Sequence, residues 1–263
     1  MTHQYGGRRV TRILACSDIH NNVKAVQQLR AREANDFDAV IVAGDIGSEK
    51  TGEIFEVFQT FDCPVLYVFG NWDRRLGYRE SFGERCHHIH LSPYPVGDLS
   101  IVGETIDGLD PDWDGVDRGD DPGAIAAARQ LHFDRQRAKL SAIVAAHRPE
   151  RAIVVSHYRL TRTQTFLPGV PLCLFGHIHR FEDVTYRGQR FVNVSALDKK
   201  VMVEKKGQRA TPGDYRYLND GSYVVITHTE REGFVVEPRR FDPEFSGWER
   251  IDGIFHSSAT EVE

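Results

Sequence analysis

Five apolar segments of this chain each end in side chains that can bind a metal ion, and this series constrains the fold more than any other feature. The segments are continuous apolar runs, which is typical of strands buried on both faces. Each segment is followed by one or two candidate ligands: RILACS by Asp18 and His20, DAVIVA by Asp45, PVLYVF by Asn71, RAIVVS by His157, and LCLFG by His177 and His179. The series predicts an α/β fold.

Two segments with helical spacing of apolar residues, 22–33 and 51–60, separate the first three runs. This strand–helix order implies parallel neighbouring strands joined by right-handed crossovers. In an open α/β sheet, ligands bind beyond the carboxyl ends of the strands. We therefore expect the seven side chains to face one crevice.

The number and type of these side chains indicate what the crevice binds. Seven ligands are too many for one tetrahedral site, and they suit two ions about 3.5–4 Å apart that share a carboxylate. Asp, Asn and His combine oxygen and nitrogen donors, a mixture that suits Mn, Fe, Zn or Ni more than Ca. A single Asp or His at a strand end is more often a helix cap or a surface group. Five in series, three of them after a glycine, favour a metal site.

In order and spacing, the series DxH, GD, GNxD, H and GHxH resembles the calcineurin-like metallophosphoesterase superfamily, over about residues 13–195. The resemblance implies an α/β/β/α sandwich of two mixed β-sheets flanked by helices, with two metal ions that share an attacking hydroxide. It implies that the first ion is held by Asp18, His20 and His179, the second by Asn71, His157 and His177, and that Asp45 bridges them. The predicted catalytic residues are Asp45, Asn71 and His157.

The third motif departs from this superfamily, because Trp72 stands where a histidine commonly protonates the leaving group. An indole N–H donates a hydrogen bond but cannot act as a general acid near neutral pH. General acid catalysis is typically worth ~10²–10⁴-fold, so hydrolysis of esters with a poor leaving group should suffer. We expect Trp72 to favour diesters or pyrophosphates and to stack on an aromatic leaving group. The alternative is that Trp72 packs as a lid or core residue.

Arginines cluster near the motifs, and a guanidinium binds phosphate in a bidentate manner. With Trp72, the predicted substrate contacts are Arg74, Arg75, Arg159 and Arg180. The alternative for each arginine is a solvated surface position. The Asp-rich stretch 107–121 lacks the offsets of a calcium-binding loop and is expected to be a solvated loop over the site.

Composition narrows the class of partner and the compartment. The formal net charge is −5, which argues against a dedicated nucleic-acid binder. The four cysteines form no CxxC pair, and they are expected to be reduced thiols. No signal-peptide core and no run of about 18 apolar residues occurs, so we expect a cytoplasmic protein without a membrane segment. We expect one domain over 1–240, a polar loop over 199–219 and a C-terminal tail over 241–263.

Together these features favour a metal-dependent phosphoesterase that hydrolyses a phosphodiester or pyrophosphate bond of a small or nucleotide-like substrate. Two divalent ions are expected, with Mn²⁺ favoured and Fe, Zn or Ni as alternatives. The other functions are a phosphomonoesterase or protein phosphatase, which Trp72 disfavours, and a non-catalytic scaffold, which retention of all seven ligand positions disfavours. The sequence indicates no oligomeric state.

Overall fold

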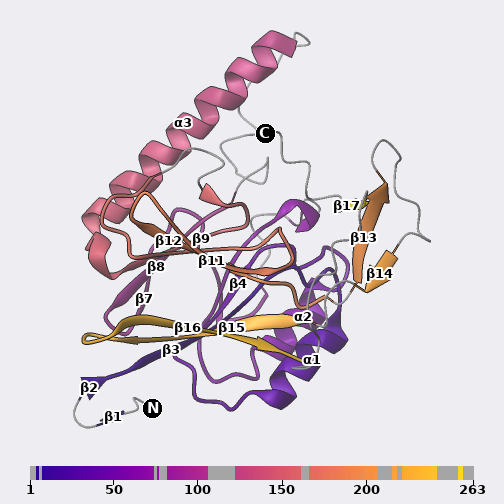
Figure 1. The fold of residues 1–263 in the computed structure, drawn as a ribbon, viewed down its shortest axis with the longest axis vertical. Coiled ribbons are helices and arrows are strands. Elements are labelled where there is room, and N and C mark those ends of the chain that lie inside the picture. The colour runs from indigo at the N-terminus through magenta and orange to yellow at the C-terminus, as the bar shows by residue number, and fades with distance from the viewer. Residues whose placement is uncertain are drawn as a thin grey trace.

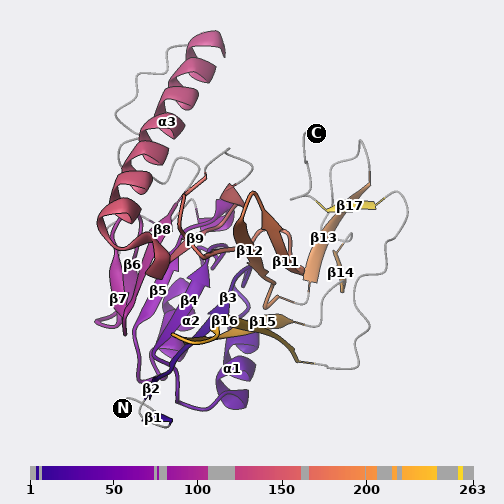
Figure 2. The ribbon, with the colours of Figure 1, turned by 60° about the vertical axis from the view of Figure 1, so that its left-hand side comes forward.

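The computed structural model describes residues 4–5, 8–73, 76, 82–105, 122–160, 166–198, 200–205, 215–217, 221–241 and 254–256. Two six-stranded sheets pack face to face, and helices cover their outer faces (Figures 1 and 2). This arrangement confirms the predicted α/β/β/α sandwich.

The first sheet has the strand order β16-β15-β3-β4-β5-β6. Its strands are β3 (Thr11–Cys16), β4 (Ala39–Ala43), β5 (Val65–Val68), β6 (Cys86–His88), β15 (Ser222–Thr229) and β16 (Gly233–Arg240). Strands β3 to β6 are parallel, whereas β15 is antiparallel to β3 and to β16. Helices α1 (Val23–Arg32) and α2 (Thr51–Phe58) make the expected crossovers. Helix α1 begins after Asn22, whose side chain accepts a hydrogen bond from the backbone N–H of Ala25.

The second sheet has the strand order β11-β12-β10-β9-β8-β7. Its strands are β7 (Tyr94–Val96), β8 (Leu99–Glu104), β9 (Ala152–Ser156), β10 (Leu172–Phe175), β11 (Phe181–Tyr186) and β12 (Gln189–Val194). The four inner strands β12, β10, β9 and β8 are parallel, and the two edge strands are antiparallel to their neighbours. The long helix α3 (Pro122–Ala146) and the short 3₁₀ helix η3 (Pro149–Arg151) precede β9.

Strand β3 shows how the apolar pattern builds the layers. Ile13 and Ala15 pack between the sheets, while Leu14 and Cys16 face α1 and α2 on the other side. Because successive side chains of a strand point to opposite faces, a strand buried on both faces needs an unbroken apolar run. The second sheet packs its outer face against α3 in the same way, through Leu140.

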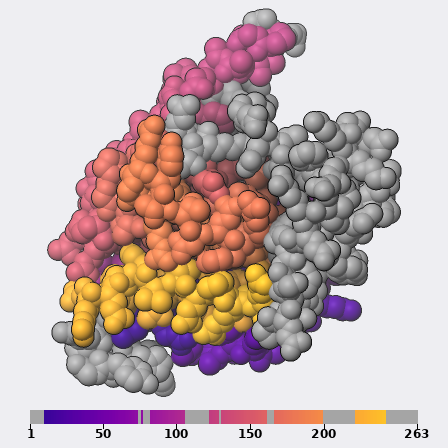
Figure 3. Space-filling view, viewed as in Figure 1, coloured from indigo at the N-terminus to yellow at the C-terminus, as the bar shows by residue number. Residues whose placement is uncertain are grey.

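The two antiparallel edge hairpins lie beside one another on one face of the sandwich, where Figure 3 shows β15 and β16 in yellow beneath β11 and β12 in orange. A hydrogen bond joins them, since the guanidinium of Arg190 on β12 donates to the carbonyl oxygen of Phe234 on β16 at 2.8 Å. The sheets are therefore tied at this edge as well as through their core.

The remaining strands form two small sheets: β1 (Gln4–Tyr5) with β2 (Arg8–Arg9), and β13 (Lys200–Lys205) between β14 (Tyr215–Tyr217) and β17 (Ile254–His256). The expectation of a loop over 199–219 is thus wrong for β13 and β14. Strand β17 lies in the predicted tail, and the boundary at residue 240 stays a prediction. The Asp-rich stretch 107–121 lies outside the described residues.

The structure also describes the cysteines and the apolar character of the helices. All four cysteines are free thiols. Among the helices of the described ranges, none has both the length and the apolar character needed to cross a membrane.

Candidate metal centre

The seven predicted metal ligands follow strands of both sheets. Strands β3, β4 and β5 of the first sheet lead into the segments with Asp18, His20, Asp45 and Asn71, and β9 and β10 of the second lead into those with His157, His177 and His179. The expected crevice therefore lies between the carboxyl ends of two sheets that face each other, rather than along the edge of one sheet.

Glycines allow the strand ends to approach this closely. A Cβ atom at Gly44 would lie 2.6 Å from His157 Nδ1, and one at Gly176 would lie 2.7 Å from Ser17 Cβ. A Cβ at Gly70 would overlap Asp45 Oδ1. A real Cβ is not found at such distances, so only glycine fits at these three positions. The glycines of the GD, GN and GH motifs thus set the spacing between the two sheets at the crevice.

The first ligand group consists of Asp18, His20 and His179, which each offer a ligand atom within 4.8 Å of the others. His179 Nε2 lies 3.0 Å from Asp18 Oδ1. The other oxygen of this carboxylate, Oδ2, accepts a hydrogen bond from the backbone N–H of His177 at 3.0 Å. One oxygen of Asp18 is therefore held by the chain and the other faces the group.

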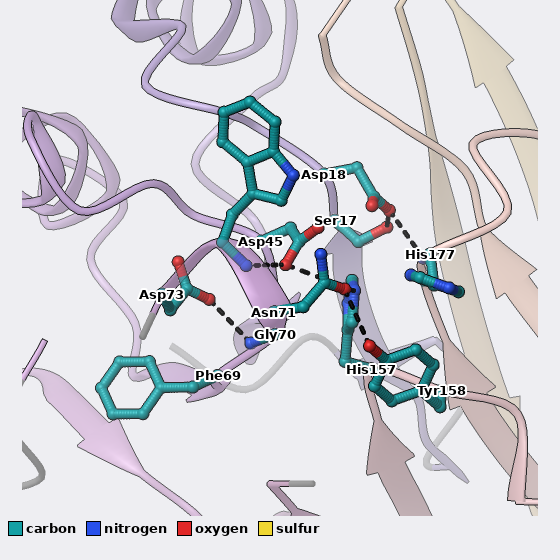
Figure 4. A network of polar contacts seen from close by, with 12 residues as sticks. Ser17, Asp18, Asp45, Phe69, Gly70, Asn71, Asp73, His157, Tyr158 and His177 are labelled. Carbon is teal, nitrogen blue, oxygen red and sulfur yellow. Dashed lines mark hydrogen bonds and ion pairs between the residues drawn. The ribbon is translucent and has the colours of Figure 1, made fainter. Parts of the chain in front are cut away.

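The second ligand group consists of Asp45, His157 and His177, again with ligand atoms within 4.8 Å of one another. Asn71 adjoins it, because its Oδ1 lies 3.1 Å from His157 Nε2 (Figure 4). The other ring nitrogen of His157, Nδ1, lies 2.9 Å from the carbonyl oxygen of Ala43. A carbonyl can only accept, so Nδ1 carries a proton and Nε2 faces the group.

Asp45 connects the two groups. Its Oδ1 lies 3.3 Å from His157 Nε2, and its Oδ2 lies 3.4 Å from His20 Nε2. The backbone N–H of Trp72 donates to Oδ1 at 2.8 Å, which fixes the carboxylate in this orientation. Each oxygen of one carboxylate thus faces a different ligand group, which is the geometry of a bridging ligand.

The backbone of the site is strained. Five of the seven ligands have positive φ angles: Asp18 (51°), His20 (49°), Asp45 (53°), His177 (71°) and His179 (56°). The left-handed conformation costs a non-glycine residue about 1–3 kcal/mol, and it persists only where the surrounding structure imposes it. Strain concentrated at one crevice is typical of a functional site.

Several buried atoms here have the character of metal ligands without a metal. In the described part of the chain, His177 Nδ1 is buried and makes no hydrogen bond, and the buried Asp18 Oδ1 has only His179 Nε2, another predicted ligand atom, at 3.0 Å. Asn71 Oδ1 and His157 Nε2 lie 3.1 Å apart, and both offer a lone pair when His157 is neutral. Two divalent cations, one in each ligand group, would satisfy these atoms. The residues present therefore fit a dinuclear metal site.

The charges of the site are mutually dependent. Burial opposes protonation of His20, but hydrogen bonds with Asp198 and Asp45 outweigh it and raise the pKa of His20 to about 10. Burial likewise opposes protonation of His157, and the charge of Asp45 outweighs it and raises its pKa to about 9. In contrast, burial and the neighbouring His157 lower the pKa of His177 to about 3. Since a metal ion requires neutral imidazoles, its binding must displace protons from His20 and His157.

Three of the predicted substrate contacts lie among the described residues. Trp72 is 42% exposed, and its ring centroid lies 4.6 Å from that of His20. Arg159 and Arg180 both form ion pairs with Glu182 on β11. The two remaining predicted contacts, Arg74 and Arg75, lie outside the described residues.

Three residues of the site were not among the predicted ligands: no local motif marks Asp198 or Tyr158, and the GNxD motif that contains Asp73 predicted no role for it. Asp198 follows β12, and its Oδ2 lies 3.5 Å from His20 Nδ1, so that it orients this ring. Tyr158 donates its hydroxyl proton to Asn71 Oδ1 at 3.1 Å. Asp73 is fully buried and accepts hydrogen bonds from the backbone N–H groups of Gly47 and Gly70, at 2.8 and 2.7 Å. Asp73 thereby joins the loops that carry Asp45 and Asn71.

Comparisons with known proteins identify the family of this chain. The calcineurin-like phosphoesterase superfamily domain matches residues 11–210. A structure from Thermus thermophilus aligns with 14% identity and a TM-score of 0.49, covering 88% of this chain and 99% of that chain. A phosphopantetheinyl hydrolase from Mycobacterium tuberculosis aligns with 15% identity and a TM-score of 0.46, covering 73% and 90%. Another solved structure, 10% identical, covers 89% of this chain and 100% of that chain with a TM-score of 0.57, which supports the fold alone. No curated protein matches.

Proposed function

Since this chain belongs to the calcineurin-like phosphoesterase superfamily, we propose that it is a metal-dependent enzyme that hydrolyses a phosphodiester or pyrophosphate bond of a small or nucleotide-like substrate. The observation that carries this proposal is the position of Asp45. Its two oxygens face two separate ligand groups, and this arrangement suits two ions that act on one phosphoryl group.

The side chains of the centre form two ligand groups that share one carboxylate. Asp18, His20 and His179 would hold one ion, Asn71, His157 and His177 the other, and Asp45 both. Two divalent ions supply, when bound, neutralisation of the phosphate charge and activation of water. We propose Mn²⁺ as the metal, with Fe, Zn and Ni as alternatives, because oxygen and imidazole donors suit these ions.

The preference for diesters rests on Trp72. Its backbone is held by Asp45 Oδ1 and by Ser48, whose hydroxyl donates to the Trp72 carbonyl oxygen at 2.8 Å. The indole is 42% exposed beside His20, so a flat leaving group can stack on it at the rim of the crevice. It offers no proton to an alkoxide, which disfavours phosphomonoesters with poor leaving groups.

The surroundings suggest how the anionic part of a substrate is held. Two arginines, Arg159 and Arg180, share one carboxylate, that of Glu182, so the cluster keeps a net positive charge. We propose that both contact the substrate, and the same proposal extends to Arg74 and Arg75. The partner is a small phosphoester and not a nucleic acid, and we propose a cytoplasmic location.

Metal analysis combined with turnover tests this function. Purified protein is expected to bind about two metal ions and, with added Mn²⁺, to hydrolyse bis-p-nitrophenyl phosphate. Turnover of the monoester p-nitrophenyl phosphate alone would instead indicate a phosphomonoesterase. Folded protein without turnover of either ester, with any of Mn²⁺, Fe²⁺, Zn²⁺ and Ni²⁺, would indicate a non-catalytic scaffold.

Replacing Trp72 by histidine is expected to shift the substrate preference. The imidazole can protonate an alkoxide, so Trp72→His should raise monoester hydrolysis relative to diester hydrolysis by at least about tenfold. The measurement is kcat/KM for a monoester with an alkoxide leaving group and for the diester bis-p-nitrophenyl phosphate, whose p-nitrophenolate leaves without needing a proton. Trp72→Phe, which keeps an aromatic face without an acid, serves as the control and should leave the ratio unchanged. An unchanged ratio in Trp72→His would contradict the role given to the indole.

A further inference from the structure

Tyr158 contacts three of the four residues that would hold the second ion. It follows His157 directly, beyond the end of β9, and is half-buried. Its hydroxyl donates to Asn71 Oδ1 at 3.1 Å (Figure 4). Its ring lies edge-on to the ring of His177, with centroids 4.3 Å apart, and to that of His157, with centroids 5.2 Å apart.

The contact with Asn71 matters because the two ends of a carboxamide differ. Only the oxygen can bind a cation, since the nitrogen carries two protons and offers no ligand lone pair. The group can rotate by half a turn, and the carboxylate oxygen Asp45 Oδ1, which lies against the same His157 Nε2 atom, would attract its N–H bonds. Without a further contact, the amide nitrogen would therefore compete for the position of the metal ligand.

The phenol favours the orientation that binds a cation. A phenol is a better hydrogen-bond donor than acceptor, because its oxygen lone pair is delocalised into the ring. A carbonyl oxygen has two lone pairs, so Asn71 Oδ1 can accept from Tyr158 and still bind a cation with the other. The position of Tyr158 is itself fixed, since the hydroxyl of Ser156 donates to its backbone carbonyl.

We propose that Tyr158 is a positioning residue for the second metal ion, whose hydroxyl holds the Asn71 carboxamide with its oxygen toward that ion. This rests on the proposed function, which assigns Asn71 as a ligand. Hydrogen-bond partners of metal ligands typically change metal affinity by about 10–100-fold when they are lost.

Tyr158→Phe tests the proposal because it removes the hydroxyl and keeps the ring against His177. Isothermal titration calorimetry of the metal-free protein with Mn²⁺ should show that one of the two binding steps is weakened about tenfold while the other is unchanged. Tyr186→Phe, which removes the hydroxyl of a 47% exposed tyrosine on β11, is the control and should bind both ions as the parent does. Wild-type affinity for both ions in Tyr158→Phe overturns the proposal.

Repeating Tyr158→Phe in an Asn71→Asp protein separates orientation of the side chain at position 71 from a general contribution of the hydroxyl to the fold. In Asn71→Asp, both ends of the side chain are ligand oxygens, so no donor is needed to select one. Adding Tyr158→Phe to Asn71→Asp should therefore change the Mn²⁺ affinity of either binding step by less than about twofold. An equal loss in both backgrounds would mean that the hydroxyl has a merely structural role, and the proposal would be wrong. The titration needs no substrate, so its result is independent of whether the protein hydrolyses phosphoesters.

Discussion

Asp45→Asn is expected to reduce phosphodiesterase activity by at least about 1,000-fold, since each tenfold corresponds to about 1.4 kcal/mol and a metal clamp is worth several kcal/mol. The substitution removes the negative charge and replaces one of the two oxygens that face separate ligand groups. Asparagine tolerates the left-handed backbone of this position, where φ is 53°, so the effect is not one of backbone strain. The measurements are kcat/KM with added Mn²⁺ and the number of bound ions.

An aspartate on the surface provides the matched control. Asp62 is 74% exposed at its side chain and pairs with Arg85, so Asp62→Asn should leave both activity and metal content unchanged. If Asp45→Asn keeps two tightly bound ions and parental turnover, the bridging role assigned to Asp45 is wrong.

Gly70→Ala is expected to disrupt the centre by adding a single methyl group. Its Cβ would overlap Asp45 Oδ1 and come within 2.6 Å of the backbone nitrogen of Asp45 and 2.8 Å of His157 Cγ. Both neighbours must move, and a displacement of about 1 Å at a reacting site can cost 10²-fold in rate. Overpacking typically costs about 1–3 kcal/mol of stability in addition. Activity and metal content should therefore fall together, and excess Mn²⁺ should not restore activity.

Gly52→Ala is the corresponding control. Gly52 lies in α2 with nothing within 4 Å of an added Cβ, and alanine is the better helix former by up to about 1 kcal/mol. This variant should keep full activity and unfold at a slightly higher temperature. A Gly70→Ala variant that behaves like Gly52→Ala would show that the close approach of the two sheets is not needed for the centre.

Much of the fold was predictable because its signals are local. The unbroken apolar runs of β3, β4, β5, β9 and β10 indicate strands buried on both faces, and the structure places each of them inside the sandwich. The expectation failed at 199–219, where β13 and β14 form, because the apolar run 201–203 is short and stands among charged residues, so it lacks the pattern that marks a buried strand.

The candidate site was predictable to the same extent. Each predicted ligand sits within a few residues of a strand end, so a short motif is enough to find it. Asp198 and Tyr158 have no such motif. Asp198 reaches the first ligand group from far along the chain, as its hydrogen bond with Asn22 across 176 residues illustrates. Tyr158 contacts Asn71 across 87 residues. Contacts over such separations follow from packing and cannot be read from neighbouring residues.

By itself, therefore, the sequence determined which side chains stand at the strand ends, the superfamily, and the substitution of Trp72 for a histidine. The tertiary structure decided that the predicted ligands come from two facing sheets, that Asp45 lies between the two groups, and that Asp198 and Tyr158 contact His20 and Asn71. The physical reason is that a strand and its final turn are specified by neighbouring residues, whereas the distance between two sheets is set by everything packed between them. At this crevice the distance between the two sheets depends on the absence of a Cβ atom at Gly44, Gly70 and Gly176.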